Sequence, residues 1–271
     1  MKVHSLIHYP VKGLGGVPVS SSFVDETGLR GDRMLMLVEA ATGTFLSQRR
    51  EPRMAALRPR LDGSVLSVDG FSTSIDHDGP RIPVTVHGWS GYGVDQGDAA
   101  ATFFSDTLGV ACRLTSVPPE QSRIGSGLTP GPVGFADGHA ILVTSLSSLD
   151  GLNERIASRG GQPVPMDRFR PNIVVSGWPE AHTEDRVRRL TIGSVELGYA
   201  KDCIRCAVPT VDQETGLKDG PEPTRTLASY RRHPEGGVAF GMKAAVLRTG
   251  ELAVGDKVDV DEWADPIIGG S

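Results

Sequence analysis

Residues 201–216 read KDCIRCAVPTVDQETG and hold two of the three cysteines of the chain, Cys203 and Cys206, with Arg205 between them. Just upstream, residues 192–197 alternate between apolar and polar side chains, which predicts a strand. The cysteines are therefore expected just past a strand end, where a rigid scaffold presents a thiol to a cleft. An arginine stabilises a neighbouring thiolate, the form that attacks substrates and binds metals. The stretch predicts a nucleophile, a redox pair or a metal ligand.

Three other interpretations stay open from the chemistry of these cysteines alone. A structural zinc site needs four ligands, but the chain has neither a second Cys-x-x-Cys pair nor a His-x3-5-His pair. A dithiol redox motif usually follows the first strand of a βαβ unit, whereas this pair comes late and no helical pattern follows it directly. Two inert core cysteines are the third interpretation, and the charge of Arg205 argues against a dry apolar pocket around them.

Composition narrows the class of protein. The chain has 271 residues, of which 38% are hydrophobic and 23% charged, as expected for a globular protein with a sizeable core. The net charge of −5 gives no broad attraction to nucleic acid or to an anionic membrane, and neither is expected as a partner. Three cysteines are too few for a disulfide framework, which favours a reducing compartment, here predicted to be the cytoplasm. Neither a signal peptide nor an apolar run of 18 residues is found.

The many turn-forming residues, 34 glycines and 19 prolines, predict a β-rich fold with few helices. Helical patterns are limited to residues 95–109, with Asp95 or Asp98 as cap, residues 147–156 behind a serine cap, and residues 224–232 with Leu227 and Tyr230 inward. Residues 118–134, which begin with two prolines, are predicted to connect two domains.

Basic residues near turns predict a site for an anion. Lys12 lies in a glycine-rich turn, residues 12–16, which lacks the order of a Walker loop. Backbone amides beside a lysine can hold a phosphate, although a solvated hairpin lysine is the commoner case. Arg33 directly precedes the apolar strand predicted at 34–38, and its fork could grip a phosphate. A solvated edge strand protected by charge is the alternative.

Residues 167–177 read DRFRPNIVVSG and form a second motif. Pro171 is expected to keep Arg170 extended, so that Arg170 and Asn172 point to one face and bind a phosphate and the polar edge of a heterocycle. A buried salt bridge with a turn asparagine is the alternative.

Together these motifs resemble the MOSC domain preceded by the MOSC N-terminal β-barrel domain. The resemblance rests on Cys-Ile-Arg-Cys with Pro-Thr-Val-Asp at 203–212, Tyr-Pro-Val-Lys-Gly at 9–13, Asp-Arg at 32–33, Arg-Glu-Pro-Arg at 50–53 and Arg-Phe-Arg-Pro-Asn at 168–172. The pattern is most similar to the mitochondrial amidoxime-reducing component and its bacterial relatives, and it covers residues 1–260.

The resemblance implies a role for each matching residue. Cys206 would supply a thiolate to molybdenum, with Cys203 as a neighbour and not a disulfide partner. Asp137 would line the substrate side of the metal and relay a proton. The remaining residues would bind the molybdopterin cofactor: Lys12, Gly13, Arg33, Arg168, Arg170, Asn172 and Arg205. Human members of the family have serine at the position of Gly13, whose backbone amide could replace the hydroxyl. Lys243 stands where the family often has tyrosine or asparagine.

The resemblance also implies the overall organisation and function. The fold is expected to be mainly β, of the α+β class, with a β-barrel-like domain at 1–117, a MOSC barrel at 118–260 and a tail at 261–271. The implied activity is molybdenum-dependent reduction of N-hydroxylated compounds such as amidoximes, hydroxylamines and hydroxylated bases. A cofactor carrier or sulfur-transfer protein is the alternative. No iron–sulfur domain is found in the sequence, so electrons are expected from a separate reductase.

Overall fold

The computed structural model describes residues 1–268 and confirms a mainly β protein with a few helices. The largest sheet has eight strands. Its order is β21 (Val258–Trp263), β17 (Val187–Ile192), β18 (Val195–Arg205), β19 (Val238–Arg248), β15 (Ile141–Ser145), β16 (Ile173–Ser176), β1 (Lys2–His8) and β3 (Val17–Val19). Neighbouring strands are antiparallel except β15 and β16, which run parallel.

Four smaller sheets complete the fold. A five-stranded sheet has the order β10 (Arg81–Val86), β11 (Trp89–Asp95), β12 (Cys112–Ser116), β6 (Leu35–Glu39) and β2 (Val11–Lys12). Two sheets have three strands each: β20 (Gly250–Ala253), β4 (Ser21–Asp25) and β5 (Gly28–Leu29), and β7 (Pro59–Asp62), β8 (Val65–Val68) and β9 (Phe71–Ser74). The hairpin of β13 (Ile124–Gly125) and β14 (Gly131–Pro132) lies within the predicted connection.

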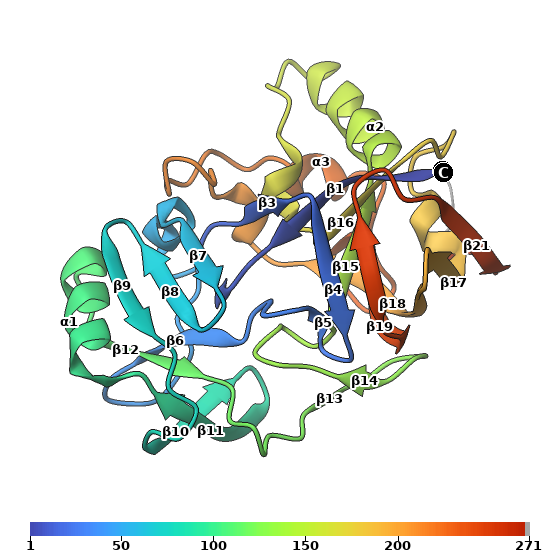
Figure 1. The fold of residues 1–271 in the computed structure, drawn as a ribbon. Helices are drawn as coiled ribbons and strands as arrows, with labels where there is room; N and C mark the ends of the chain where they lie inside the picture. Colours follow the sequence, from blue (N-terminus) through green and yellow to red (C-terminus); the bar gives the residue numbers. More distant parts are fainter. Residues whose placement is uncertain (269–271) are drawn as a thin grey trace.

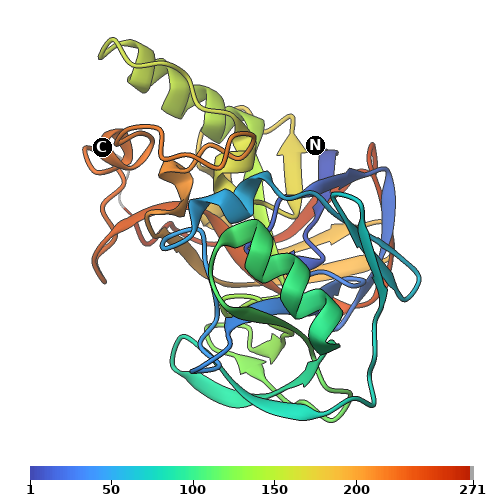
Figure 2. The ribbon, with the colours of Figure 1, turned by 90° about the vertical axis from the view of Figure 1, so that its left-hand side faces the viewer.

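The helices are short; α1 lies apart from α2, and α3 packs beside α2 (Figures 1 and 2). The α-helices are α1 (Gly97–Leu108), α2 (Leu146–Ala157) and α3 (Thr224–Leu227), and the 3-10 turns are η1 (Pro52–Ala56), η2 (Met166–Phe169), η3 (Thr183–Arg186) and η4 (Val208–Thr210). Helix α1 ends where Gly109 adopts a left-handed conformation and donates its N–H to Ser105 O. Helix α2 begins at Ser145, whose side chain accepts the N–H of Ser148.

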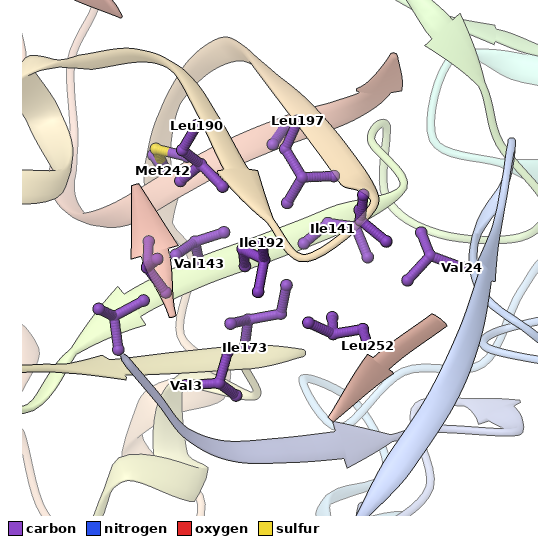
Figure 3. Close-up of a cluster of buried hydrophobic side chains, with 14 of the residues drawn as sticks. Val3, Val24, Ile141, Val143, Ile173, Leu190, Ile192, Leu197, Met242 and Leu252 are labelled. Carbon is purple, nitrogen blue, oxygen red and sulfur yellow. The ribbon is translucent and has the colours of Figure 1, made fainter. Parts of the chain in front are cut away.

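The large sheet joins the two ends of the chain. Strand β1 pairs with β16, with Leu6 opposite Ile173, and the first strand therefore belongs to the sheet of the second half (Figure 1). Figure 3 shows the resulting core, in which Val3 and Val24 point toward Ile173 and Leu252. The domain boundary predicted at residue 117 stays a prediction. The large sheet contains strands from both sides of that boundary.

The structure corrects four local predictions. Residues 192–197 do not form one strand: β17 ends at Ile192 and β18 begins at Val195, with a turn between them. Arg170 is not extended, because it closes η2 in a left-handed conformation with φ 56° and ψ 46°. The residue before α1 is Gln96, and neither Asp95 nor Asp98 makes a capping hydrogen bond.

The fourth correction concerns the predicted helix at 224–232, which is limited to the four residues of α3. Leu227 is buried as predicted, and Tyr230 is only partly buried. In the predicted tail, β21 extends to Trp263, and residues 269–271 lie outside the described part of the chain.

Candidate functional site

One pocket collects residues from seven separate segments of the sequence: 12–13, 33, 45–49, 136–142, 169–172, 203–208 and 243. Its empty space is about 890 Å³, counted out to the open mouth. The pocket is lined by every site residue that the sequence predicted except Arg168: Lys12, Gly13, Arg33, Asp137, Arg170, Asn172, Arg205 and Cys206. Lys12 ends β2, Asn172 precedes β16, and Cys206 follows β18, so the rigid sheets fix these side chains around a common space.

Arg33 is held by a network of hydrogen bonds to residues from both halves of the chain, here called the arginine bracket. Its Nη1 donates to Asp32 Oδ2 at 2.5 Å and to Asn172 Oδ1 at 3.0 Å, and its Nη2 donates to Arg170 O at 3.2 Å. Asn172 Nδ2 donates to Asp32 Oδ1 at 3.0 Å and to Ile7 O at 3.2 Å. The amide of Asn172 is thus engaged by protein on both sides, and it orients Arg33 in this structure.

The Arg170 side chain donates fewer hydrogen bonds to the protein than the Arg33 side chain does. Its Nη1 donates to Gln213 Oε1 at 3.1 Å, and its guanidinium lies 4.4 Å from the centroid of the Tyr9 ring, as does that of Arg33. Burial lowers the pKa of Arg170 to about 10 and raises the pKa of Tyr9 to about 12, so at neutral pH Arg170 is charged and Tyr9 is not. Two buried cations stacked on one ring favour an anion beside them.

Both arginines have left-handed backbones. The φ angle of Arg33 is 50° and that of Arg170 is 56°, a region in which side chains other than glycine are strained by about 1–2 kcal/mol. Such strain persists where the surrounding contacts enforce it and is concentrated at functional sites.

Asp137 lies between two basic side chains at the pocket mouth. It accepts from Lys12 Nζ, and His87 Nε2 lies 3.2 Å from its Oδ1. Just over half of its side-chain surface faces the opening. Partial desolvation by the pocket walls would raise its pKa, but the charge of Lys12 and the contact with His87 outweigh this effect and hold the pKa well below the usual range. Asp137 is therefore a carboxylate at neutral pH. Burial also lowers the pKa of Lys12, and Asp137 opposes that change.

The two cysteines have different surroundings, and both thiols are free. Arg205 Nη1 donates to Cys203 Sγ at 2.9 Å and Nη2 donates to Phe169 O at 2.8 Å. Arg205 therefore contacts Cys203, because residues two apart on the strand β18 share a face. Cys206 follows the strand and receives only the N–H of Val208 at 3.5 Å. Arg205, which adjoins Cys206 in the sequence, thus directs its guanidinium to Cys203.

The surroundings of two further predicted residues, Gly13 and Arg168, show how they contribute to the fold. Gly13 has φ 87°, and a Cβ there would lie 2.7 Å from Met54 Cε, so a side chain at this position would be strained. Arg168 lies away from the pocket. Its Nη2 donates to Asp219 at 2.5 Å and to Asp212 at 3.3 Å, and its Nη1 donates to Pro209 O at 3.3 Å. These contacts support the loop that follows the cysteines.

The sequence did not point to three contributors. His87 is one, and it lies in the turn between β10 and β11. The other two are Gln48 and Gln213, which exchange hydrogen bonds of 2.9 and 3.2 Å and link Arg170 to the carbonyl of Gly13. Glutamines carry no charge and match no motif. His87 matches no motif either, and the sequence marks its turn only by the glycine that follows, Gly88.

The charge of the pocket opposes that of the chain. Six lining residues are basic and one, Asp137, is acidic, although the whole chain carries −5. The basic residues are Lys12, Arg33, Arg49, Arg170, Arg205 and Lys243. The Nε–H of Arg205 is buried without a hydrogen-bond partner in residues 1–268. This lining suits an anionic ligand with hydrogen-bond acceptors. Within the same residues, no three His, Cys, Asp or Glu side chains are grouped to hold a metal ion.

Comparison with known proteins agrees with the motifs. Residues 130–259 match the MOSC domain and residues 1–111 the MOSC N-terminal beta barrel domain. Mitochondrial amidoxime-reducing component 1 of Mus musculus is 32% identical over 92% of this chain and 79% of its own length, and that of Homo sapiens is 31% identical over 92% and 80%. Molybdenum cofactor sulfurase of Oryza sativa is 29% identical over 88% of this chain but only 32% of its own length. Among the described helices, none has the length and apolar character needed to cross a membrane.

Proposed function

This chain belongs to the MOSC family, and we propose that it is a molybdenum-cofactor-dependent reductase of N-hydroxylated compounds. The observation that carries the proposal is the convergence of a thiol, a carboxylate and an excess of cations on one pocket. A pterin cofactor with a phosphate and a thiolate-bound metal needs this donor set. The names of the mouse and human relatives refer to amidoxime reduction and support the choice of substrate class.

The residues present fit the cofactor. Lys12, Arg33 and Arg170 would hold its phosphate, since all three are basic and line the same pocket, with Lys12 and Arg170 buried and Arg33 half-buried. Cys206 would be the metal ligand, because its soft thiol lies on the wall and makes only one long contact with the protein. Arg205 would contact the pterin through its unpartnered Nε–H. When bound, the cofactor supplies the two electrons of the reaction.

Side chains of the protein would transfer the protons that the reaction consumes. Converting an N–OH group to N–H and water consumes two electrons and two protons. Asp137 is held as a carboxylate, so it is suited to accept a hydrogen bond from the N–OH group and to pass a proton rather than to store one. His87 is partly exposed and touches the same carboxylate at 3.2 Å, so it connects Oδ1 of Asp137 to solvent.

Electrons would come from a separate reductase. The sequence has no Gly-x-Gly-x-x-Gly fingerprint, no haem-attachment motif and no cysteines beyond the three for an iron–sulfur cluster. Location in the cytoplasm is part of the same proposal.

The test is turnover of benzamidoxime by protein purified from a host that makes the cofactor, after its molybdenum and pterin contents are measured. We expect benzamidine to form with a reduced viologen dye and not with NADPH alone. Comparable rates with NADPH would show that a nucleotide site was missed. Cofactor-loaded protein that reduces no N-hydroxylated compound would refute the proposal. If it instead carries a persulfide on Cys206 after treatment with a sulfur donor, the sulfur-transfer alternative, which the similarity to the rice sulfurase supports, would replace it.

A further inference from the structure

A row of residues runs across strands β15, β19 and β18 at the edge of the pocket. Lys243 of β19 lies directly opposite Leu142 of β15 on one side and Lys201 of β18 on the other. Residues opposite each other in a sheet project from the same face, so Lys201 and Lys243 lie together. Leu142 and Lys243 line the pocket. On its far side Leu142 contacts Asn172, whose Oδ1 accepts the N–H of Leu142 at 3.2 Å.

The two lysines lack a counter-charge in the described structure. Neither Lys201 nor Lys243 has a carboxylate within ion-pair distance among residues 1–268. Like charges opposite each other in a sheet destabilise it, so the pairing is unfavourable without an anion. Asp137, the one acidic residue of the described lining, is already occupied by Lys12 and His87.

His139 lies at the same positively charged end of the pocket, where the charges of Lys243 and Lys201 act on it. It is buried in the wall, its Nε2 contacts Ser126 O, and its Nδ1 is buried without a partner among the described residues. Burial, opposed by the contact with Ser126 and reinforced by Lys243 and Lys201, lowers its pKa to about 4. The imidazole is therefore neutral at neutral pH and adds no further charge.

This positive end is separate from the arginine bracket. Lys243 and Asn172 flank Leu142, two strand spacings apart, which places their backbones about 10 Å from each other. Arg33 is fixed at the Asn172 end by three hydrogen bonds. A phosphate held by Arg33 and Arg170 therefore leaves Lys243 free for a different anionic group.

We infer that Lys243, supported by Lys201, binds an anionic group on the substrate, and that the substrates are N-hydroxylated compounds with a carboxylate or phosphate distant from the N–OH group. Lys201 and Cys206 are five positions apart along β18 and its end, or roughly 15 Å of strand. A lysine side chain spans part of this length, and the substrate spans the rest. The inference rests on the proposed function for the reacting end of the pocket.

The experiment compares benzamidoxime with 4-carboxybenzamidoxime, whose carboxylate lies across the ring from the reacting group. We expect the wild-type protein to have the lower KM for the carboxylated compound. Lys243→Gln should raise that KM about tenfold and leave the KM for benzamidoxime unchanged, because one charge-assisted hydrogen bond is lost. Lys243→Arg should keep the preference. Lys2→Gln, which removes an exposed lysine of β1, is the matched control and should change neither value.

Equilibrium binding separates this inference from the proposed function. Calorimetry on the oxidised, cofactor-loaded protein without an electron donor measures the affinity for both compounds without turnover. A carboxylate preference that Lys243→Gln abolishes supports the inference even if neither compound is reduced. Reduction of both compounds with equal KM in wild type and Lys243→Gln would overturn the inference alone. Lower pterin content in Lys243→Gln would also overturn it, because the anion would then belong to the cofactor.

Discussion

The two arginines of the Arg-Phe-Arg-Pro-Asn motif allow a matched test of phosphate binding. Arg170 lies in the pocket and makes one hydrogen bond to a side chain, that with Gln213. Arg168, two residues earlier, lies outside the pocket and is paired with Asp212 and Asp219. Both side chains are more than nine-tenths buried. Arg170→Gln and Arg168→Gln therefore remove the same charge from the same motif at different places.

The expected loss follows from the contacts. A hydrogen bond from a charged donor contributes about 1.5–3 kcal/mol, and an arginine fork can make two with a phosphate. Loss of one such bond weakens cofactor binding by about 10- to 150-fold, since 1.4 kcal/mol corresponds to a factor of ten. Arg168→Gln should leave the affinity unchanged and lower the melting temperature instead, because breaking a buried ion pair costs about 3–5 kcal/mol.

The assay is the pterin content per protein chain, measured by fluorescence after oxidative release, with each variant produced at limiting cofactor. We expect Arg170→Gln to retain a tenth or less of the wild-type content while its unfolding stays cooperative. Wild-type content in Arg170→Gln would refute the assignment of the phosphate to this end of the pocket. Equal losses in both variants would show that the motif acts through folding alone.

Two other predictions concern single side chains. Cys206→Ser should abolish activity and molybdenum retention, whereas Cys203→Ser should keep much of both, as judged by metal analysis; equal losses would support a shared dithiol site. Burial lowers the pKa of His139 to about 4 and that of His182 to about 3, below the ordinary value near 6.5. Between these values the unfolded chain binds more protons than the folded chain. The free energy of unfolding should therefore fall as the pH drops from about 6.5 toward 4. In denaturant titrations His182→Gln should flatten this slope by about 1.4 kcal/mol per pH unit; an unaltered slope in His182→Gln would contradict the argument.

The sequence predicted the strand-rich class and eight of the residues that line the pocket, because both depend on local signals. Lys12 adjoins a glycine-rich turn, Arg33 precedes an apolar strand, and Cys206 belongs to a compact motif. These signals name residue types but not their partners. The contact of Arg205 with Cys203 depends on where β18 ends, and the alternating pattern did not give that end.

The turn between β17 and β18 shows why. Gly193 and Ser194 form a two-residue connection between the paired residues Ile192 and Val195, which are three positions apart. The phase of the alternation therefore changes at this turn, and reading one strand through it missed the Gly-Ser pair that marks the hairpin. The prediction that Arg170 is extended was wrong for another reason. The residue before a proline is usually extended, but Arg170 ends the turn η2 in the left-handed region.

The pairing of β1 with β16 joins residues about 170 positions apart and has no local signal, yet it creates the pocket. Arg33 and Asp32 come from the first part of the chain and Asn172 from the second, and their hydrogen bonds close one wall. The same wall has two strained arginine backbones and buried cations that repel one another. These features oppose folding unless other contacts offset them. An anion between the arginines offsets the repulsion directly, so ligand binding and the association of the two halves of the chain should stabilise each other.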